Sequence, residues 1–274
     1  MPRPAGTSHG RYLARAALSR AGALKPVSCL RERVLAARAA ELEGPAPDGL
    51  PLPPARLRVL VDGSGTPEGF LAQSDVHARL IRDTLASADV HLERLGAILD
   101  FGCGCGRTAR RWASLSGPEL HGCDYNPQLV AWCREHLPFM EARVNALEPP
   151  APYPDESLDL VYALSILTHL PDDLAHGWVA EWARILKPGG LLLVTTHGDA
   201  YRPALGRRAG PRYDAGQAVV VGSRMAGANA CTAHHPPSYV TERLLTAFEP
   251  VAFVPGGSVP HFRQDVHLAR LRST

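Results

Sequence analysis

Apolar residues in the central part of the chain occur in two patterns, continuous runs and helical spacing, which alternate along the sequence. Residues 97–101 and 119–124 form short, nearly continuous apolar runs, which predict buried strands. Apolar positions recur with helical spacing over about 67–86, 126–137 and 174–186. Strands that alternate with helices are typical of an α/β fold with a parallel sheet.

The N-terminal part of the chain predicts two further helices before this α/β part. Helical spacing predicts helices over about 9–24 and 27–42, and a Pro- and Gly-rich stretch at 44–54 then breaks the pattern. We therefore expect a helical extension with its linker, residues 1–70, followed by a main domain, residues 71–274.

Past residue 200 the pattern predicts an insertion. Residues 239–245 have helical spacing, and 248–254 and 265–271 predict two further strands. The preceding residues 201–237 are rich in Gly, Pro and Arg. Because insertions at the carboxyl ends of parallel strands lie over the ligand crevice, we expect 201–237 to be a substrate lid that leaves the cofactor-binding part untouched. An incidental surface loop is the alternative.

The run at 97–101 leads directly into a glycine-rich turn. Three glycines alternate with other residues there: Gly102, Gly104 and Gly106. Glycines permit a tight turn and let backbone N–H groups approach a ligand closely, and residues 108–116 can continue as a helix. A strand, a glycine turn and a helix in succession predict a site for a nucleotide-like cofactor.

The spacing of this turn indicates which cofactor. Dinucleotide enzymes use Gly-x-Gly-x-x-Gly to seat a pyrophosphate on a helix N-terminus, whereas the spacing here is Gly-x-Gly-x-Gly. Asp100, two residues before the first glycine, would repel a pyrophosphate but attract the cationic amino group and sulfonium of S-adenosylmethionine. No Gly-Lys-Ser/Thr follows the turn, which argues against a Walker-type phosphate loop.

A second acidic residue favours the same cofactor. Asp124 ends the run at 119–124, one βαβ unit after Asp100. A carboxylate at the tip of the second strand can accept hydrogen bonds from both ribose hydroxyls. The alternative is that Asp124 only caps a turn. Asn126 and Pro127 supply a capping residue and a first helical residue for the helix that follows.

These motifs together resemble the class I S-adenosylmethionine-dependent methyltransferases, specifically bacterial small-molecule methyltransferase domains. The similarity covers about residues 75–200, with ILDFGCGCGR at 98–107, CDYNP at 123–127, SLDLVYALSILTHL at 157–170 and LKPGGLLLVTT at 186–196. It implies a Rossmann-like, doubly wound α/β fold with a seven-stranded sheet and an antiparallel C-terminal strand. It also implies a third strand at 139–145, a fourth within 157–170 and a fifth at 191–196.

The resemblance implies S-adenosyl-L-methionine as the cofactor. The residues that would bind it are Asp100, Gly102, Cys103, Gly104, Gly106, Arg107, Asp124, Tyr125, Asn145, Ala146, Leu164 and Ser165. Asn145 departs from the family pattern, because such enzymes usually place an acidic residue beside the adenine. An asparagine can still bond the adenine amine.

Catalysis is harder to locate than cofactor binding. Methyl transfer from a sulfonium is an in-line displacement that mostly needs alignment, and a general base is needed only for a hydroxyl or similar acceptor. Histidine suits that role near neutral pH. The catalytic candidates follow the expected fourth strand, the fifth strand and the insertion: His169, His197 and His234, which His235 follows. Each could equally be a structural histidine, and the sequence does not single one out.

Composition limits the partners. The chain has 274 residues and a formal net charge of +2, which creates no general field for nucleic acid. No apolar run approaches the roughly 18 residues that span a membrane, so we expect a cytoplasmic protein. Six cysteines lack the regular spacing of a disulfide framework or a zinc site, so we expect neither disulfides nor a metal.

We therefore expect a methyltransferase with a small-molecule acceptor, and a sugar or secondary-metabolite hydroxyl is the specific hypothesis. One alternative is an RNA or protein methyltransferase that uses the arginine-rich N-terminal helices. Another is a cofactor-binding module without catalysis. Residues 164–167 read Leu-Ser-Ile-Leu in place of an Asn/Asp-Pro-Pro-Tyr/Phe motif, which argues against methylation of base amino groups. The sequence does not predict the oligomeric state.

Overall fold

The structure is a computed structural model that describes residues 14, 17–18, 24–38, 46–63 and 65–273. The expected helix at 9–24 lies largely outside these residues. The helix expected at 27–42 is present in the described part as α2 (Leu24–Arg38). Among the described helices, none is both long and apolar enough to cross a membrane.

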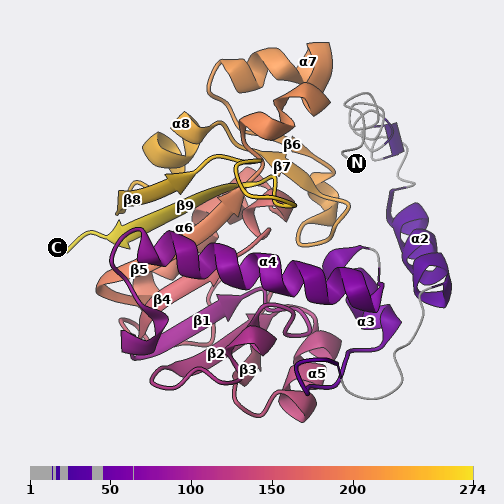
Figure 1. Cartoon of the computed structure of the whole chain (residues 1–274). Coiled ribbons are helices and arrows are strands. Elements are labelled where there is room, and N and C mark those ends of the chain that lie inside the picture. The colour runs from indigo at the N-terminus through magenta and orange to yellow at the C-terminus, as the bar shows by residue number, and fades with distance from the viewer. Residues whose placement is uncertain (1–13, 15–16, 19–23, 39–45, 64, 274) are drawn as a thin grey trace.

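Seven strands form the central sheet in the order β3-β2-β1-β4-β5-β9-β8 (Figure 1). The first five strands of the chain run parallel, and β9 is antiparallel to both of its neighbours. The predicted doubly wound sheet with an antiparallel C-terminal strand is therefore confirmed. The strands are β1 (Ala97–Phe101), β2 (Glu119–Asp124), β3 (Glu141–Val144), β4 (Leu158–Ala163), β5 (Leu186–Thr196), β8 (Phe248–Val254) and β9 (Asp265–Leu271).

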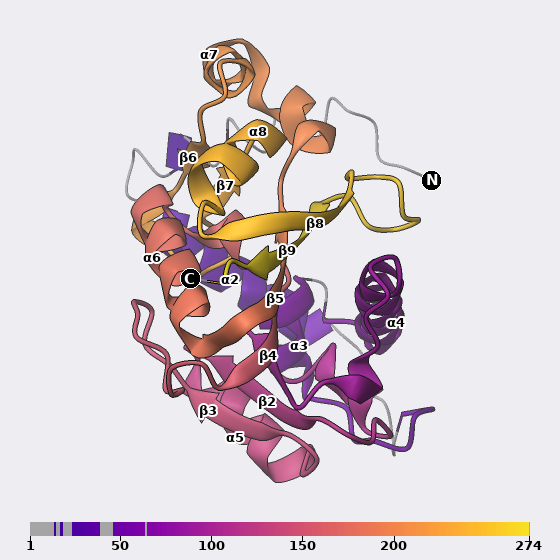
Figure 2. The same cartoon turned by 90° about the vertical axis from the view of Figure 1, so that its left-hand side faces the viewer.

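Helices cover both faces of the sheet. Figure 2 shows α4 (Pro67–Ala86) and α6 (Asp172–Ile185) on opposite sides of the strands. One core lies under α4 and α5 (Pro127–His136), and the other lies under α6. Burial on both faces explains why the strands appear in the sequence as continuous apolar runs. Phe101 at the end of β1 packs against Trp178 and Trp182, with ring centroids 4.6 and 5.1 Å away.

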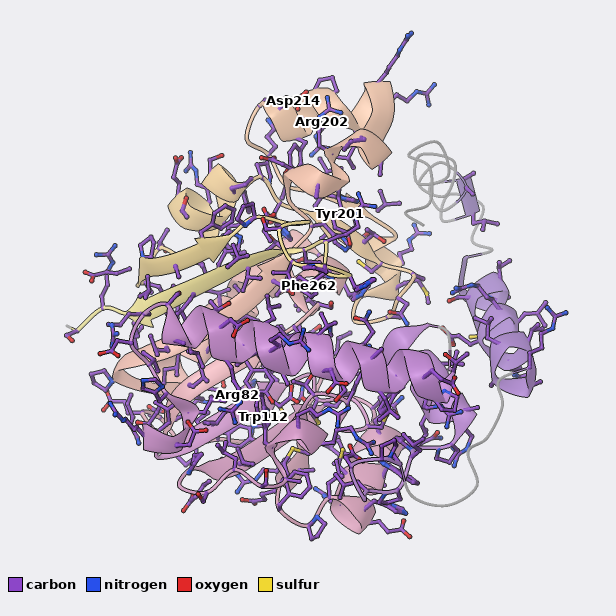
Figure 3. The ribbon with its side chains drawn as sticks, viewed as in Figure 1. Arg82, Trp112, Tyr201, Arg202, Asp214 and Phe262 are labelled. Atoms are coloured by element: carbon purple, nitrogen blue, oxygen red, sulfur yellow. The ribbon has the colours of Figure 1, made fainter. Side chains whose placement is uncertain are left out.

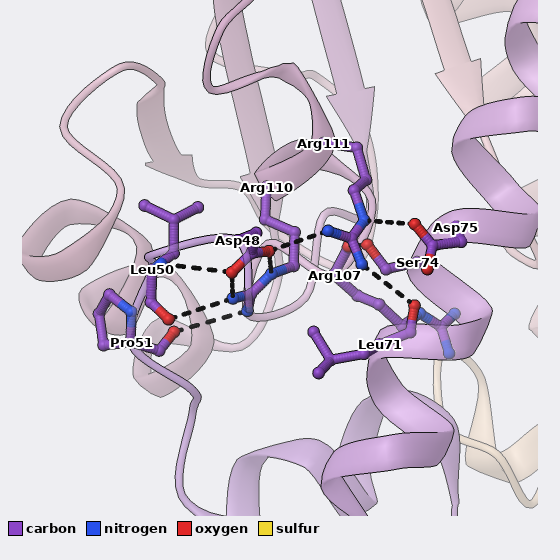
Figure 4. A network of polar contacts seen from close by, with 9 residues as sticks. All are labelled: Asp48, Leu50, Pro51, Leu71, Ser74, Asp75, Arg107, Arg110 and Arg111. Carbon is purple, nitrogen blue, oxygen red and sulfur yellow. Dashed lines mark hydrogen bonds and ion pairs between the residues drawn. The ribbon is translucent and has the colours of Figure 1, made fainter. Parts of the chain in front are cut away.

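The segment after the glycine turn differs from its prediction. The expected helix over 108–116 is one 3₁₀ turn, η2 (Ala109–Trp112). Arg110 donates to both carboxylate oxygens of Asp48 at 2.6 and 2.7 Å, and Arg111 links Asp48 to Asp75 of α4 (Figure 4). These contacts, with Gly117 and Pro118 close behind, limit the helix to a single turn.

The insertion contains more regular structure than its composition suggests. It holds α7 (Arg202–Asp214) and a hairpin of β6 (Val219–Val221) and β7 (Thr232–His234). The helix expected at 239–245 is a short α8 (Pro237–Tyr239) that continues as a π-helical turn, η6 (Val240–Leu244). Helix α3 (Ala55–Asp62) packs beside α4 and α2 on the N-terminal side.

Candidate functional site

The glycine loop after β1 is bonded to the tip of β2. The N–H groups of Gly102 and Cys103 donate to the carbonyl of Cys123 at 2.8 and 2.9 Å, and that of Gly104 donates to Asp124 Oδ2 at 3.0 Å. The expectation that these N–H groups face a ligand is therefore wrong. Phosphate-binding loops offer free N–H groups and a long helix N-terminus, whereas here these three N–H groups are bonded within the protein and the loop leads into a single 3₁₀ turn. It fits a nucleoside better than a pyrophosphate.

The glycines are required by the shape of this loop. Their φ angles are +74°, +57° and +76° at Gly102, Gly104 and Gly106, a region that side chains disfavour. A Cβ at Gly106 would lie 2.1 Å from Leu137 Cδ1, at the end of α5. The loop can therefore pack tightly against α5 while its other side stays open to a ligand.

A cavity of about 270 Å³ opens over this loop and the tips of the parallel strands. Nine of the twelve predicted cofactor residues line it: Gly102, Gly104, Arg107, Asp124, Tyr125, Asn145, Ala146, Leu164 and Ser165. The other three, Asp100, Cys103 and Gly106, are buried and are not part of its lining. The structure therefore brings most of these residues together at one cavity, and their role in cofactor binding stays a prediction.

Asp100 lies below the cavity, although the sequence predicted that it faces the cofactor. It is 6% exposed, accepts a hydrogen bond from Tyr162, and its Oδ2 has no partner among the described residues. Burial raises the pKa of Asp100 to about 7, and Tyr162 and Arg107 partly oppose this rise. A cation bound in the cavity above would favour the ionised carboxylate.

Asp124 lines the cavity and holds the loop at the same time. Its Oδ1 accepts the N–H of Asn126 at 2.8 Å, and its Oδ2 accepts that of Gly104 at 3.0 Å. Burial raises the pKa of Asp124, and these two bonds oppose the rise. Each carboxylate oxygen has more than one acceptor site, so both can still accept from a ligand hydroxyl.

The roof of the cavity comes from distant segments, of which the sequence predicted only the insertion over the ligand crevice. Residues of α2 and α3 contribute, and so does the strap, our name for residues 225–229 of the insertion. Gly227 N–H donates to the carbonyl of His169 at 2.9 Å, and Asn229 Nδ2 donates to that of Leu60 at 3.1 Å. The strap thus lines the same cavity as the predicted cofactor residues, so the expectation that the insertion leaves them untouched is wrong.

A larger cavity of about 640 Å³ adjoins the first. The two share Val61, Arg107, Ser165, His169 and Asn229. The other walls of the larger cavity come from α4, from Tyr201 and from the loop at 261–264. Figure 3 shows Tyr201 and Phe262 between α4 and α7.

Ser165 stands in the wall between the cavities in a left-handed conformation, with φ of +61°. Its N–H donates to Thr195 Oγ1 at 2.7 Å, and Thr195 Oγ1 donates to Gln264 Oε1 at 2.5 Å. Gln264 Nε2 closes the ring by donating to Ser165 Oγ at 2.7 Å. This ring fixes the carboxyl ends of β4 and β5 to the loop that precedes β9.

The structure separates the three predicted histidines. His169 lines both cavities, and its Nδ1 lies 2.8 Å from the carbonyl oxygen of Cys231. A carbonyl only accepts, so Nδ1 carries the proton and Nε2 holds the lone pair of the neutral ring. His197 and His234 are buried and belong to neither lining. Burial lowers the pKa of His197 well below its ordinary value, and its Nδ1 donates to the carbonyl of Ala233 at 3.1 Å.

The cysteines near the glycine loop are free thiols. Cys103, Cys105, Cys123 and Cys133 are all buried, and the sulfurs of Cys103 and Cys133 both contact the carbonyl of Gly104. Within the described residues, no group of three or more His, Cys, Asp or Glu side chains is placed to hold a metal ion.

Comparisons with known proteins agree with this geometry. Residues 99–194 match the methyltransferase domain family. The sterol 24-C-methyltransferase ERG6A of Gibberella zeae is 35% identical over 100 residues, which cover 34% of this chain and 26% of that protein. The ubiquinone biosynthesis O-methyltransferase of Xanthomonas oryzae pv. oryzae is 36% identical over 110 residues, which cover 38% of this chain and 45% of that protein. The chain therefore spans less than half the length of these relatives.

A solved structure shows the same fold. The S-adenosylmethionine-dependent methyltransferase from Mesorhizobium loti superposes with a TM-score of 0.52 at 16% identity, over 72% of this chain and 99% of that chain. At this identity the likeness establishes the fold, and it leaves the acceptor open.

Proposed function

Because residues 99–194 match the methyltransferase domain family, we propose that the chain is a class I S-adenosylmethionine-dependent methyltransferase that transfers a methyl group to a small-molecule acceptor. The observation that carries this proposal is the pair of adjoining cavities, with His169 and Ser165 in their shared wall. One cavity suits the cofactor and the other the acceptor, so the methyl group passes across this wall.

The smaller cavity fits S-adenosylmethionine. Asp124 would accept from the ribose hydroxyls, and the buried Asn145 Oδ1, which has no partner among the described residues, would accept from the adenine amine. The unpartnered Oδ2 of Asp100 would supply negative charge beneath the cationic end of the cofactor. The bound cofactor supplies an electrophilic methyl group, and the protein aligns it.

The acceptor then lies in the larger cavity and reacts through oxygen. His169 Nε2 would take the proton of an acceptor hydroxyl as its oxygen received the methyl group, and the sulfur of the cofactor would keep the electron pair of the broken C–S bond. A sugar or secondary-metabolite hydroxyl is the proposed acceptor. The named relatives act at carbon in one case and at oxygen in the other, so the choice of oxygen rests on His169.

The enclosure of the site favours this function over the alternatives. Helices α2 and α3 and the strap all contribute to the cofactor cavity, which suits a small acceptor better than RNA or protein. A module without catalysis would need only the smaller cavity. The larger one, with His169 at its junction, favours an enzyme.

Methyl transfer from labelled S-adenosylmethionine to a panel of phenols, sugars and quinols tests the proposal. We expect an O-methylated product, and His169→Asn should lower kcat by about 100- to 10,000-fold, because it removes a general base. The affinity for S-adenosylhomocysteine should not change. The control His197→Asn, which alters a histidine outside both cavities, should keep turnover. Full turnover in His169→Asn would contradict the assigned base.

A further inference from the structure

The larger cavity is positively charged. Two guanidinium groups, those of Arg107 and Arg263, line it, and among the described lining residues there is no Asp or Glu. We propose that the acceptor carries an anionic group, a carboxylate or a phosphate, which binds to Arg263. This inference rests on the proposed function and specifies the class of acceptor.

Arg263 is held at the cavity wall by groups that do not neutralise it. Its Nη2 donates to the carbonyl of Ala200 at 2.8 Å, and its guanidinium carbon lies 5.3 Å from the ring centroid of Tyr201. No carboxylate in the described part of the chain forms an ion pair with it. The remaining N–H donors of its planar fork can bind a carboxylate or phosphate bidentately.

A second arginine near Tyr201 differs from Arg263, because it forms an ion pair with a carboxylate. Arg202, one residue after Tyr201, donates to both oxygens of Asp214 at 2.6 and 2.5 Å, so its charge is already paired (Figure 3). It lines neither cavity. Arg263 has the same chemistry without the acidic partner, and it faces the larger cavity.

The loop that carries Arg263 has a fixed position. Gln264 belongs to the hydrogen-bonded ring with Ser165 and Thr195, and Phe262 is buried with its ring 5.7 Å from that of His77 on α4. The backbone that carries Arg263 is therefore fixed relative to the ends of β4 and β5, and its exposed guanidinium is held by Ala200 and Tyr201. A binding group must be held in a fixed position to recognise one particular acceptor.

The other basic groups of this cavity are less suited to recognise the acceptor. Arg107 lines both cavities, and its charge acts on Asp100, whose pKa it lowers. Burial, and then the charge of Arg107, lower the pKa of His77 well below its ordinary value, so this ring stays neutral. Among the described lining residues, Arg263 therefore supplies the guanidinium that belongs to the larger cavity alone.

Calorimetric binding to the protein saturated with S-adenosylhomocysteine tests this assignment. The probes are two pairs, 4-hydroxybenzoate with its neutral amide and glucose 6-phosphate with glucose. We expect one anion to bind at least about tenfold more tightly than its neutral partner, and the pair that shows this preference distinguishes carboxylate from phosphate. Arg263→Gln should abolish the preference, Arg263→Lys should retain part of it, and the control Arg202→Gln should leave it intact.

Equal affinity for the anion and its neutral partner, or a preference that persists in Arg263→Gln, would overturn the inference. Failure of both anions to bind up to about 10 mM would overturn it as well. The binding of S-adenosylhomocysteine is measured separately, and its absence would contradict the proposed function. Rising salt should weaken anion binding in the unmodified protein, which gives a readout that needs no variant.

Discussion

At the scale of single residues, Asp124 connects folding with binding. One carboxylate accepts two backbone N–H groups and also faces the cofactor cavity. The same charge thus shapes the glycine loop and stays available to ribose hydroxyls. A change at this residue should therefore affect the loop and the ligand together.

Asp124→Asn tests this double role. The amide replaces one acceptor oxygen with an N–H₂ group that faces a backbone N–H, so we expect the Kd for S-adenosylhomocysteine to rise about tenfold or more. Asp159→Asn is the matched control, because Asp159 accepts the N–H groups of Gly96 and Ala97 at the opposite end of β1. Calorimetry should show a loss of affinity for the first variant only. Unchanged affinity in Asp124→Asn would leave this residue with a turn-capping role alone.

The sequence predicted which residues lie at the strand ends. It did not predict whether the side chain of each one lines the cavity or is buried beneath it. The order of parallel strands brings their tips together, which placed Asp124, Asn145 and Ser165 at one cavity. Whether a side chain points into that cavity or beneath it depends on the exact pleat and on the loop path, so Asp100 was misplaced. The same limit explains why sequence alone did not separate His169 from the buried histidines.

At the scale of elements, the strap closes the cofactor cavity. Its central Gly227 has φ of +77°, and a Cβ there would lie 2.8 Å from Leu147 Cδ1. The strap bonds to the carbonyls of His169 on one side and Leu60 on the other. Its position therefore depends on a residue without a side chain.

Gly227→Ala should displace the strap. A side chain in the left-handed region costs about 1 to 2 kcal/mol, and the contact with Leu147 forces a further shift. Gly189→Ala is the control, because Gly189 has φ of +74° with open space around its Cβ position, at the amino end of β5. Both variants should lose stability in urea unfolding, Gly227→Ala somewhat more, and only Gly227→Ala should weaken S-adenosylhomocysteine binding. Equal binding by both variants would show that the strap is not part of the cofactor site.

Elements with strong periodicity were predicted correctly, and those set by tertiary contacts were not. The strands at 97–101 and 119–124 and the helix at 67–86 follow from local patterns and caps, as in the Thr66 side chain that accepts the N–H of Gly69. The helix expected at 108–116 is shortened because its arginines bind Asp48, about sixty positions earlier. Such long-range ion pairs leave no local signal.

At the scale of the whole molecule, buried neutral histidines couple stability to pH. Burial lowers the pKa of His235 and His267 to about 4 and lowers that of His77 and His197 well below 6.5. The unfolded chain binds protons at these histidines below about pH 6.5, and the folded chain does not. Asp100 acts in the opposite direction between its ordinary 3.8 and about 7, because it is protonated only when folded.

Burial also raises the pKa of Asp124 and Asp265, which act in the same direction as Asp100. Four histidines outweigh these carboxyl groups, so stability should fall with acid. Near pH 5.5 we expect unfolding to take up about two to three protons, so that the free energy of unfolding drops by roughly 3 kcal/mol per pH unit. Urea titrations between pH 7 and 5 measure this slope. His267→Gln should reduce it by about one proton. A free energy of unfolding that stays constant over this range would show that these histidines are not kept neutral by the fold.

The sheet topology could be predicted from the order of the motifs, whereas the way in which three segments close the cavity could not. A βαβ succession fixes which strands lie side by side, so β1, β2 and β4 meet at the glycine loop as expected. The cavity roof joins α2, α3 and the strap, which lie far apart in the chain. Their meeting is decided by packing, and their local sequences contain no pattern for it.

The central claim is that the smaller cavity holds S-adenosylmethionine rather than a dinucleotide. Isothermal titration of the purified protein with S-adenosylmethionine, S-adenosylhomocysteine and NAD tests it most directly. The account predicts saturable binding of both sulfur nucleosides, which Asp124→Asn weakens, and no binding of NAD, because the N–H groups of Gly102, Cys103 and Gly104 are already bonded within the protein. Binding of NAD without binding of either sulfur nucleoside would contradict it.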